Sequence, residues 1–91
     1  MEIGGGRHGV YLQVGETVVI EAEVYVVNQT IDVRVDYPDC VELLTGGALQ
    51  KAGPHLEPVI HSWTFQGRSI GDGSIMVWAE ANMISVRVHV E

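Results

Sequence analysis

Histidine, cysteine and methionine are the residues of this sequence that could build a metal site. The four histidines are spread along the chain, at His8, His55, His61 and His89. None has a second ligand at the short spacing of a local zinc motif. A blue-copper site needs Cys, His and Met close together near the C-terminus, and Cys40 and Met83 do not provide that spacing. The sequence therefore predicts no native metal site and no cofactor.

The single cysteine is the other candidate for chemistry. Cys40 can form no internal disulfide because the chain holds no second cysteine. As a nucleophile it would need a histidine within hydrogen-bond reach, since a thiol without one is weak. We expect a buried, inert thiol. We likewise expect His61 to pack beside Trp63 with its ring nitrogen satisfied, and His89 to lie on the wet face of the last strand.

Three carboxylates, Asp36, Asp39 and Glu42, crowd one turn. Their oxygens suit a calcium ion, but the spacing is unlike that of an EF-hand, and a solvated acidic rim is the favoured interpretation. Asn28-Gln29-Thr30 has the form of a glycosylation acceptor, which has meaning only in a secretory pathway. As a plain turn, the tripeptide already has a structural reason to exist.

The glycine-rich start matches the G-x-G-x-x-G phosphate-binding pattern over residues 4–9. That motif works between a strand and a helix N-terminus, whereas here only three residues precede it and a strand-like run follows at 10–14. Residues 1–9 are therefore predicted to be a flexible leader or linker remnant, followed by one domain over 10–91.

Length and charge exclude several classes of protein. A chain of 91 residues holds one small domain with a single core. The net charge is −7 and the five basic residues are scattered, which argues against a nucleic-acid partner. No apolar run approaches the roughly 20 residues of a membrane span. The start lacks the features of a signal peptide, so we expect a cytoplasmic protein or, slightly favoured, a domain excised from a longer extracellular or cell-surface precursor.

Alternation of apolar and polar residues predicts strands along most of the chain. The clearest unit is a closing hairpin, with a turn at 71–73, strands at 74–81 and 83–91, and a second turn at Ala81-Asn82. Further strands are expected at 10–14, 17–27, 31–37, 40–44 and 59–66, and a loop at 45–58 because glycine and proline interrupt it. No window has a helical period. About seven short strands predict an all-β antiparallel sandwich.

Five motifs follow one another along the chain: VGETVVI at 14–20, NQT at 28–30, DYPDCVEL at 36–43, SWTF at 62–65 and GDGSI at 71–75. Their order resembles the bacterial and archaeal Ig-like repeats of surface and secreted proteins. The resemblance implies an Ig-like β-sandwich with an accessory, structural or protein-interaction role and no catalytic residues. The sequence departs from that pattern at Cys40, where glycine is common, and in its histidine content.

Large apolar residues are expected on the outer faces of two strands. If Ile75 and Val77 face the core, Met76 and Trp78 point outward. On the long strand, the residues pointing outward are Val19, Tyr25 and Val27. We predict an interaction surface centred on Met76 and Trp78, with Tyr25 and Val27, that contacts a second copy or an adjacent domain. In the alternative, loop 45–58 folds back and covers Trp78.

Two other functions remain open on the sequence. Tyr11, Tyr25 and Trp78 could offer flat rings to a glycan, which would make the chain a carbohydrate-binding module, and a small metal-binding β-sandwich is a further alternative. An enzyme is not expected, because nothing in the sequence brings His, Asp and Ser together at short range.

Overall fold

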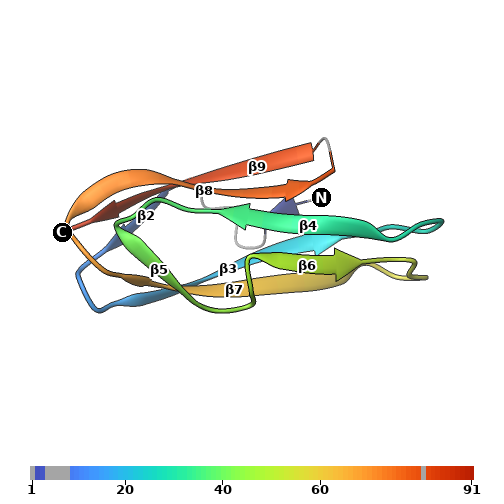
Figure 1. The fold of residues 1–91 in the computed structure, drawn as a ribbon, viewed down its shortest axis with the longest axis horizontal. Helices are drawn as coiled ribbons and strands as arrows, with labels where there is room; N and C mark the ends of the chain where they lie inside the picture. The colour runs from blue at the N-terminus through green and yellow to red at the C-terminus, as the bar shows by residue number, and fades with distance from the viewer. Residues whose placement is uncertain (1, 4–8, 81) are drawn as a thin grey trace.

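The chain is a sandwich of two β-sheets (Figure 1). The computed structural model describes residues 2–3, 9–80 and 82–91. Its strands are β1 (Glu2–Ile3), β2 (Gly9–Leu12), β3 (Thr17–Val24), β4 (Ile31–Asp36), β5 (Val41–Thr45), β6 (Leu49–Ala52), β7 (Val59–Gly67), β8 (Gly71–Ala79) and β9 (Asn82–Val90). One sheet has the order β1-β3-β7-β5 and the other β2-β9-β8-β4-β6. The predicted all-β sandwich is confirmed, with nine strands in the described residues rather than about seven.

The β8–β9 hairpin has the predicted inward face. Ile75 lies opposite Val86, Val77 lies opposite Ile84, and Ile75, Val77 and Val86 are buried. The predicted turn at Ala81-Asn82 is wrong for Asn82, while Ala81 lies outside the described residues. Asn82 belongs to β9 and pairs with Ala79, while Glu80 takes a left-handed φ of 55°, a conformation for which the sequence rule prefers asparagine or glycine. A two-residue turn at Ala81-Asn82 would put Glu80 opposite Met83, whereas Met83 lies opposite Trp78; this shift of two residues leaves every side chain on the same face.

The predicted turn at 71–73 is also wrong, because these residues open β8. At Gly73 a side chain would collide with the ring of Pro38. Glycine at this position lets β8 pass close to Pro38, in the segment that connects β4 to β5. Its role is to allow this close approach and not to reverse the chain.

The β3–β7 pair supplies the other half of the core. Ile20 lies opposite Trp63 and Val18 opposite Phe65, and both aromatic side chains are fully buried. The indole nitrogen of Trp63 donates a hydrogen bond to the Gly47 carbonyl at 2.9 Å. Inward residues of β3, β4, β7, β8 and β9 thus form one apolar layer between the sheets, as the alternation predicted.

The first strands join different sheets. β1 pairs antiparallel with β3, whereas β2 pairs parallel with β9, so this one pair departs from the predicted antiparallel arrangement. This parallel pairing at a sheet edge joins segments about 80 residues apart in the sequence, and no local pattern reveals it. Of the predicted leader 1–9, residues 2–3 form β1 and Gly9 begins β2, while 4–8, with His8, lie outside the described residues.

The predicted loop at 45–58 contains a strand. β6 pairs antiparallel with β4 at the edge of the five-stranded sheet. Its four residues lie between Gly47 and Gly53 and are too few to show a period, which is why the sequence pattern missed it. β5, predicted as a short edge strand, is confirmed at the edge of the other sheet. The buried thiol predicted at Cys40 is confirmed as well.

Candidate functional site

The outer face of the five-stranded sheet carries a row of large side chains at one register level. Trp78 on β8 lies opposite Met83 on β9 and opposite Arg34 on β4, and Arg34 lies opposite Leu49 on β6. We call these four residues the Trp78 row. Met83 and Leu49 are about half exposed, at 45% and 56%. Four neighbouring strands therefore present a continuous row of large side chains to the outside.

Trp78 lies at the centre of this row. The guanidinium carbon of Arg34 is 5.7 Å from the centroid of the Trp78 ring, a cation–π geometry. The Trp78 indole N–H is buried and has no hydrogen-bond partner within the described part of the chain. A buried donor without an acceptor costs free energy, and the described residues of the domain supply no acceptor for this indole N–H.

An open hollow of about 710 Å³ lies beside Trp78. Its lining is Thr30, Ile31, Asp32, Arg34, Leu49, Lys51, Trp78 and Glu80. Lys51 forms an ion pair with Asp32, and Arg34 lies 3.9 Å from the Asp36 carboxylate. The charges of the hollow are thus largely balanced, and its apolar wall is formed by Ile31, Leu49 and Trp78.

The structure separates the residues of the predicted interaction surface. Met76 and Trp78 lie on the outer face of the five-stranded sheet and are partly buried. Tyr25 and Val27 follow the end of β3, in the other sheet, and are 52% and 48% exposed. In the alternative prediction, segment 45–58 covers Trp78. Leu49 of this segment does line the hollow beside Trp78, but Arg34 lies between Leu49 and Trp78 in the sheet, so the alternative holds only in part. The contact itself stays a prediction.

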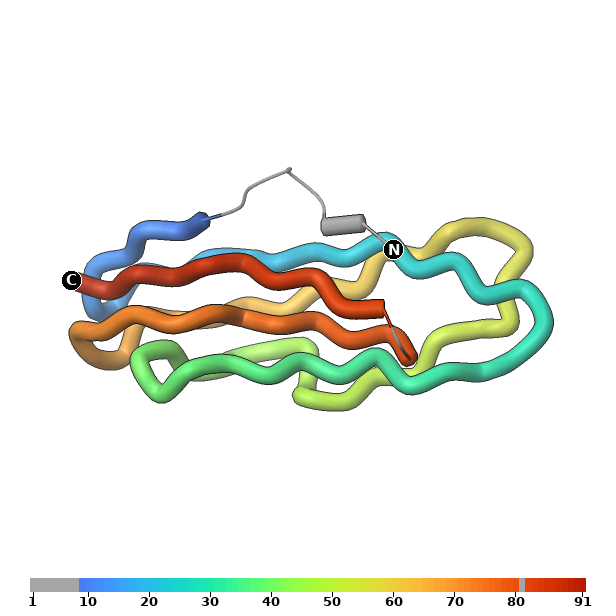
Figure 2. Tube along the Cα trace, turned by 90° about the horizontal axis from the view of Figure 1, so that it is seen from above, coloured from blue at the N-terminus to red at the C-terminus, as the bar shows by residue number. Residues whose placement is uncertain are grey.

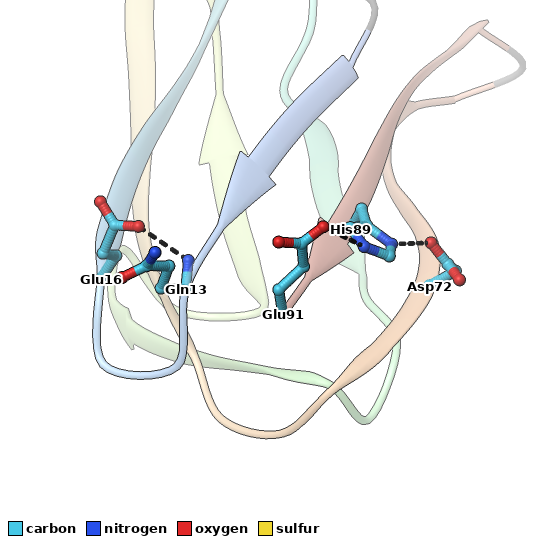
Figure 3. A network of polar contacts seen from close by, with 5 residues as sticks. All are labelled: Gln13, Glu16, Asp72, His89 and Glu91. Carbon is cyan, nitrogen blue, oxygen red and sulfur yellow. Dashed lines mark hydrogen bonds and ion pairs between the residues drawn. The ribbon is translucent and has the colours of Figure 1, made fainter.

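A second polar group occupies the same face at the other end of β8 and β9 (Figure 3). His89 contacts the Asp72 carboxylate through Nδ1 and the Glu91 carboxylate through Nε2, the latter at 3.1 Å. Tyr11 on β2 lies edge-on to the His89 ring at a centroid distance of 5.8 Å. His89 was expected on the wet face, and it is there. Its partner Asp72 lies directly across the hairpin, so the register of that hairpin is the signal that could have found the pair.

This cluster is a clip between strands rather than a catalytic group. The hydrogen bond to Asp72 is the main cause that raises the pKa of His89, and Glu91 adds to it. Both ring nitrogens are occupied by carboxylates, so neither is free to take a proton from a substrate. The imidazolium form ties β8 to the end of β9.

The stability of the protein should therefore depend on pH through His89. Because folding raises the pKa of His89, its contribution is complete below the unfolded value of about 6.5 and is lost as the pH rises through the folded value. We expect the difference in unfolding free energy between wild type and His89→Gln to shrink as the pH rises from about 5.5 to about 9. Urea unfolding across this range measures it. A difference that stays constant or grows with pH would contradict the role of the clip.

His61 packs beside Trp63 as predicted, with the rings stacked at 6.4 Å and 25°. Its Nδ1 contacts the Gln50 side-chain oxygen at 2.6 Å, so one ring nitrogen is satisfied, while Nε2 is buried without a partner among the described residues. Burial, reinforced by nearby His55, lowers the pKa of His61. Gln50 lies in the segment expected to be a loop, so no sequence pattern indicates this contact.

The remaining candidates lie apart from one another. Within residues 2–3, 9–80 and 82–91, no group of three or more His, Cys, Asp or Glu side chains is placed to hold a metal ion. Asp36, Asp39 and Glu42 are all exposed. Tyr11 lies opposite His89 and Trp78 lies opposite Met83, and these two partners are six residues apart along β9. The rings of Tyr11 and Trp78 are therefore about 20 Å apart. The residues named for glycan binding therefore do not form one platform.

In the described part of the chain, no helix is long and apolar enough to cross a membrane.

Comparisons with known proteins identify the fold. No family model and no curated protein sequence matches the chain. A solved structure does match: the crystal structure of the S-layer protein SbsC, domains 4 and 5, with a TM-score of 0.65 and 14% identity. The match covers 99% of this chain and 51% of that one, so the chain spans about half the length of its structural relative. The chain is therefore similar in fold, over almost its whole length, to part of an S-layer protein.

Proposed function

We propose that this chain is a non-catalytic, Ig-like structural or protein-interaction module of a cell-surface or secreted protein. The observation that carries the proposal is the likeness of 99% of the chain to half of an S-layer protein chain. An S-layer is a surface assembly, and a module in such a setting needs faces that contact neighbours rather than a cleft. The Trp78 row supplies a face of that kind.

The order of the strands supports the Ig-like part of the proposal. In the Ig constant-type layout, strands A, B, E and D form one sheet and C, F and G the other. Taking β1, β3, β7 and β5 as A, B, E and D, and β4, β8 and β9 as C, F and G, matches this layout, with β2 and β6 as additional edge strands of the second sheet. β6 departs from that layout, since it follows the strand in the D position and pairs with the strand in the C position.

We further propose that the outer face of the five-stranded sheet is the contact face, toward a second copy or an adjacent domain. Interface anchors are enriched in Trp and Arg, and the Trp78 row places the two residues against each other between Met83 and Leu49. The unpaired indole N–H adds a reason, because a partner that reorders this face can supply its acceptor.

Sedimentation of the wild type and of Trp78→Ser tests this face. We expect wild type to self-associate and Trp78→Ser to do so at least about tenfold more weakly, as for an interface anchor. Ile60→Ser is the matched control, because Ile60 is 61% exposed on β7, on the outer face of the other sheet, and its loss should change nothing.

The contrary outcome is equally specific. In a Trp63→Phe background, emission reports Trp78 alone. If the wild type is a monomer, and Trp78 in the Trp63→Phe background emits as a buried indole, the domain itself covers this residue. Self-association through the face would then be wrong.

A further inference from the structure

One histidine is enclosed between the two sheets. His61 lies on the inward side of β7 beside fully buried Trp63, and only 8% of its surface is exposed. Among the residues that the structure describes, it is the only buried polar or charged side chain. A free imidazole has a pKa of about 6.5, so a moderate fall in pH sets the burial of this ring against its protonation.

Gln50 fixes which nitrogen of the His61 ring carries the proton. Its amide nitrogen faces the carbonyl oxygens of Gly46 and Ser62, which can only accept hydrogen bonds. The amide oxygen is therefore the atom that lies 2.6 Å from Nδ1 of His61, and Nδ1 must donate. The next proton has to enter at Nε2, which is buried and has no partner in the described part of the chain.

No carboxylate is placed to receive that proton. The charged side chains of the elements around the ring are all exposed to solvent: Glu21 and Glu23 of β3, Asp32 and Arg34 of β4, Lys51 of β6 and Glu57 of loop 53–58. None of the ion pairs in the described ranges involves His61. Burial, and next to it the charge of nearby His55, lowers the pKa of His61. The closed structure thus resists a proton that a free ring would take.

The segment that covers the ring is lightly attached. β6 lies at the edge of the five-stranded sheet, and Ala52 is the one apolar side chain that it buries. The loop that follows carries Leu56, which is 92% exposed. Figure 2 shows that loop beside loop 25–30 at one end of the long axis. We call β6 and the loop, residues 49–58, the flap. A segment with so few buried contacts is among the first to open.

Hydrogen bonds show where the flap can open. Just before it, the indole nitrogen of Trp63 donates to the Gly47 carbonyl at 2.9 Å and anchors the chain to β7. Within it, His55 N–H donates to the Val26 carbonyl at 2.8 Å. Opening breaks the second bond and keeps the first. Both groups of the broken bond then meet water, which replaces the bond at a modest net cost.

We infer that the flap is an acid-sensitive latch: at low pH His61 takes up a proton at Nε2, and the flap leaves β7 and the edge of β4 so that the charged ring reaches water. The flap carries Leu49 to the Trp78 row, so its opening also removes one side of the proposed contact face. That consequence rests on the proposed function, whereas the opening itself does not.

Opening of the flap should increase as the pH falls. In the open state the ring of His61 meets water and has its ordinary pKa of about 6.5, whereas burial and His55 lower the pKa in the closed state. Above about pH 7.5 the ring is neutral in both states, so pH has no effect. Below about pH 6.5 the open state binds a proton that the closed state does not. Its population then rises by up to about tenfold for each pH unit, until the closed state is protonated as well.

Amide hydrogen exchange measures this opening. Because Val35 N–H donates to the Ala48 carbonyl, the alternation of an antiparallel ladder makes Gln50 and Ala52 the flap residues whose N–H groups bond to β4. Their exchange rates from about pH 7.5 to about pH 5, divided by the intrinsic rates, give the opening constant. We expect this constant to rise by about tenfold or more in wild type, while the amides of the β3–β7 pair stay protected.

Two variants serve as controls. His61→Leu keeps an apolar side chain at this place and cannot titrate, so its flap opening should not depend on pH, whatever its level. His55→Asn removes a neighbouring positive charge and should raise the pKa of His61, which the ring ¹⁵N signals report. The amide spectrum shows whether each variant is folded. If His61→Leu is not, the wild-type ring decides, because a pKa of His61 at or above about 6.5 would contradict the latch and a lower one would support it.

Three results would overturn the inference: flap exchange that does not change with pH in wild type, the same change in folded His61→Leu, or an equal rise at the β3–β7 amides, which would mean that the whole domain unfolds. Repeating the measurement in Trp78→Ser ensures that self-association does not hide the opening. A wild type that is a monomer near neutral pH would remove the contact face and leave the latch standing. Flat flap exchange in a wild type that self-associates would remove the latch alone.

Discussion

Replacing Trp63 with alanine is expected to lower the unfolding free energy by about 4 kcal/mol, the cost of a cavity the size of an indole in a packed core. Trp63 is fully buried and, opposite Ile20, occupies the middle of the β3–β7 pair. The change also removes the hydrogen bond from its indole nitrogen to the Gly47 carbonyl. A domain of this size has a total stability of roughly 5–14 kcal/mol, so this one side chain accounts for a large part of it.

Denaturant unfolding followed by far-UV circular dichroism measures the effect without using tryptophan emission. Trp63→Phe is the control, since it keeps most of the apolar volume and loses the donor, and we expect it to cost about 1–2 kcal/mol. Similar losses for the two variants would mean that the hydrogen bond, and not packing, dominates. A loss below about 1 kcal/mol for the alanine variant would contradict the central place of Trp63 in the core.

Adding a single methyl group at Gly46 should destabilise the fold by about 3 kcal/mol, the sum of backbone strain and a steric clash. Gly46 has φ +104°, and a Cβ there would lie 2.5 Å from the Ser62 carbonyl oxygen and 2.7 Å from Cδ1 of Trp63. The chain crosses here from β5 in one sheet to β6 in the other, directly against β7. The backbone can pass at that distance only without a side chain.

Gly47 provides a matched control one residue later. Its φ is +70°, but the nearest atom to a Cβ is the Leu49 carbonyl oxygen at an ordinary 3.8 Å. Gly47→Ala should therefore cost only the strain, about 1 kcal/mol. Urea unfolding of the two variants compares them. Equal losses would show that the close approach of Gly46 to β7 does not limit the crossover.

The sequence predicted the core well because the strands are half buried. Alternation in β8 and β9 assigned Ile75, Val77 and Val86 to the interior, and all three are buried. The same alternation puts Trp63 and Phe65 on one face of β7, and the structure shows that this face is the buried one. Alternation reports which side of a strand is covered, and that information is local. It survived an error of two residues in the hairpin register, since such a shift preserves the faces.

Pairing between distant segments could not be predicted in the same way. The parallel β2–β9 pair joins an early strand to the last one, and β6 is too short to show a period. The contact of Gln50 with His61 depends on the crossover between β5 and β6, which no spacing in the sequence encodes. These features depend on tertiary packing, which decides where an irregular segment lies.

The predicted interaction surface includes some residues that alternation placed correctly and others that it did not. The outward direction of Met76 and Trp78 followed from alternation, and both side chains lie on the outer face of the five-stranded sheet. Alternation did not place Tyr25 and Val27 correctly, because the strand predicted over 17–27 ends at Val24. Arg34 and Leu49 complete the Trp78 row on its β4 side. They lie on strands whose order in the sheet is set by long-range pairing.

The methyl groups of Met76 and Met83 report most directly on the proposed contact face. Both methionines lie on β8 and β9 of the outer face, where Met83 is opposite Trp78 and Met76 is two residues before it in the strand. We would record their ¹³C-methyl signals in wild type from about 10 μM to about 1 mM, the range in which weak contacts form. The account predicts that both signals shift with concentration and that Trp78→Ser abolishes the shift. Methyl signals that stay constant across this range, in a wild type that sediments as a monomer, would contradict it.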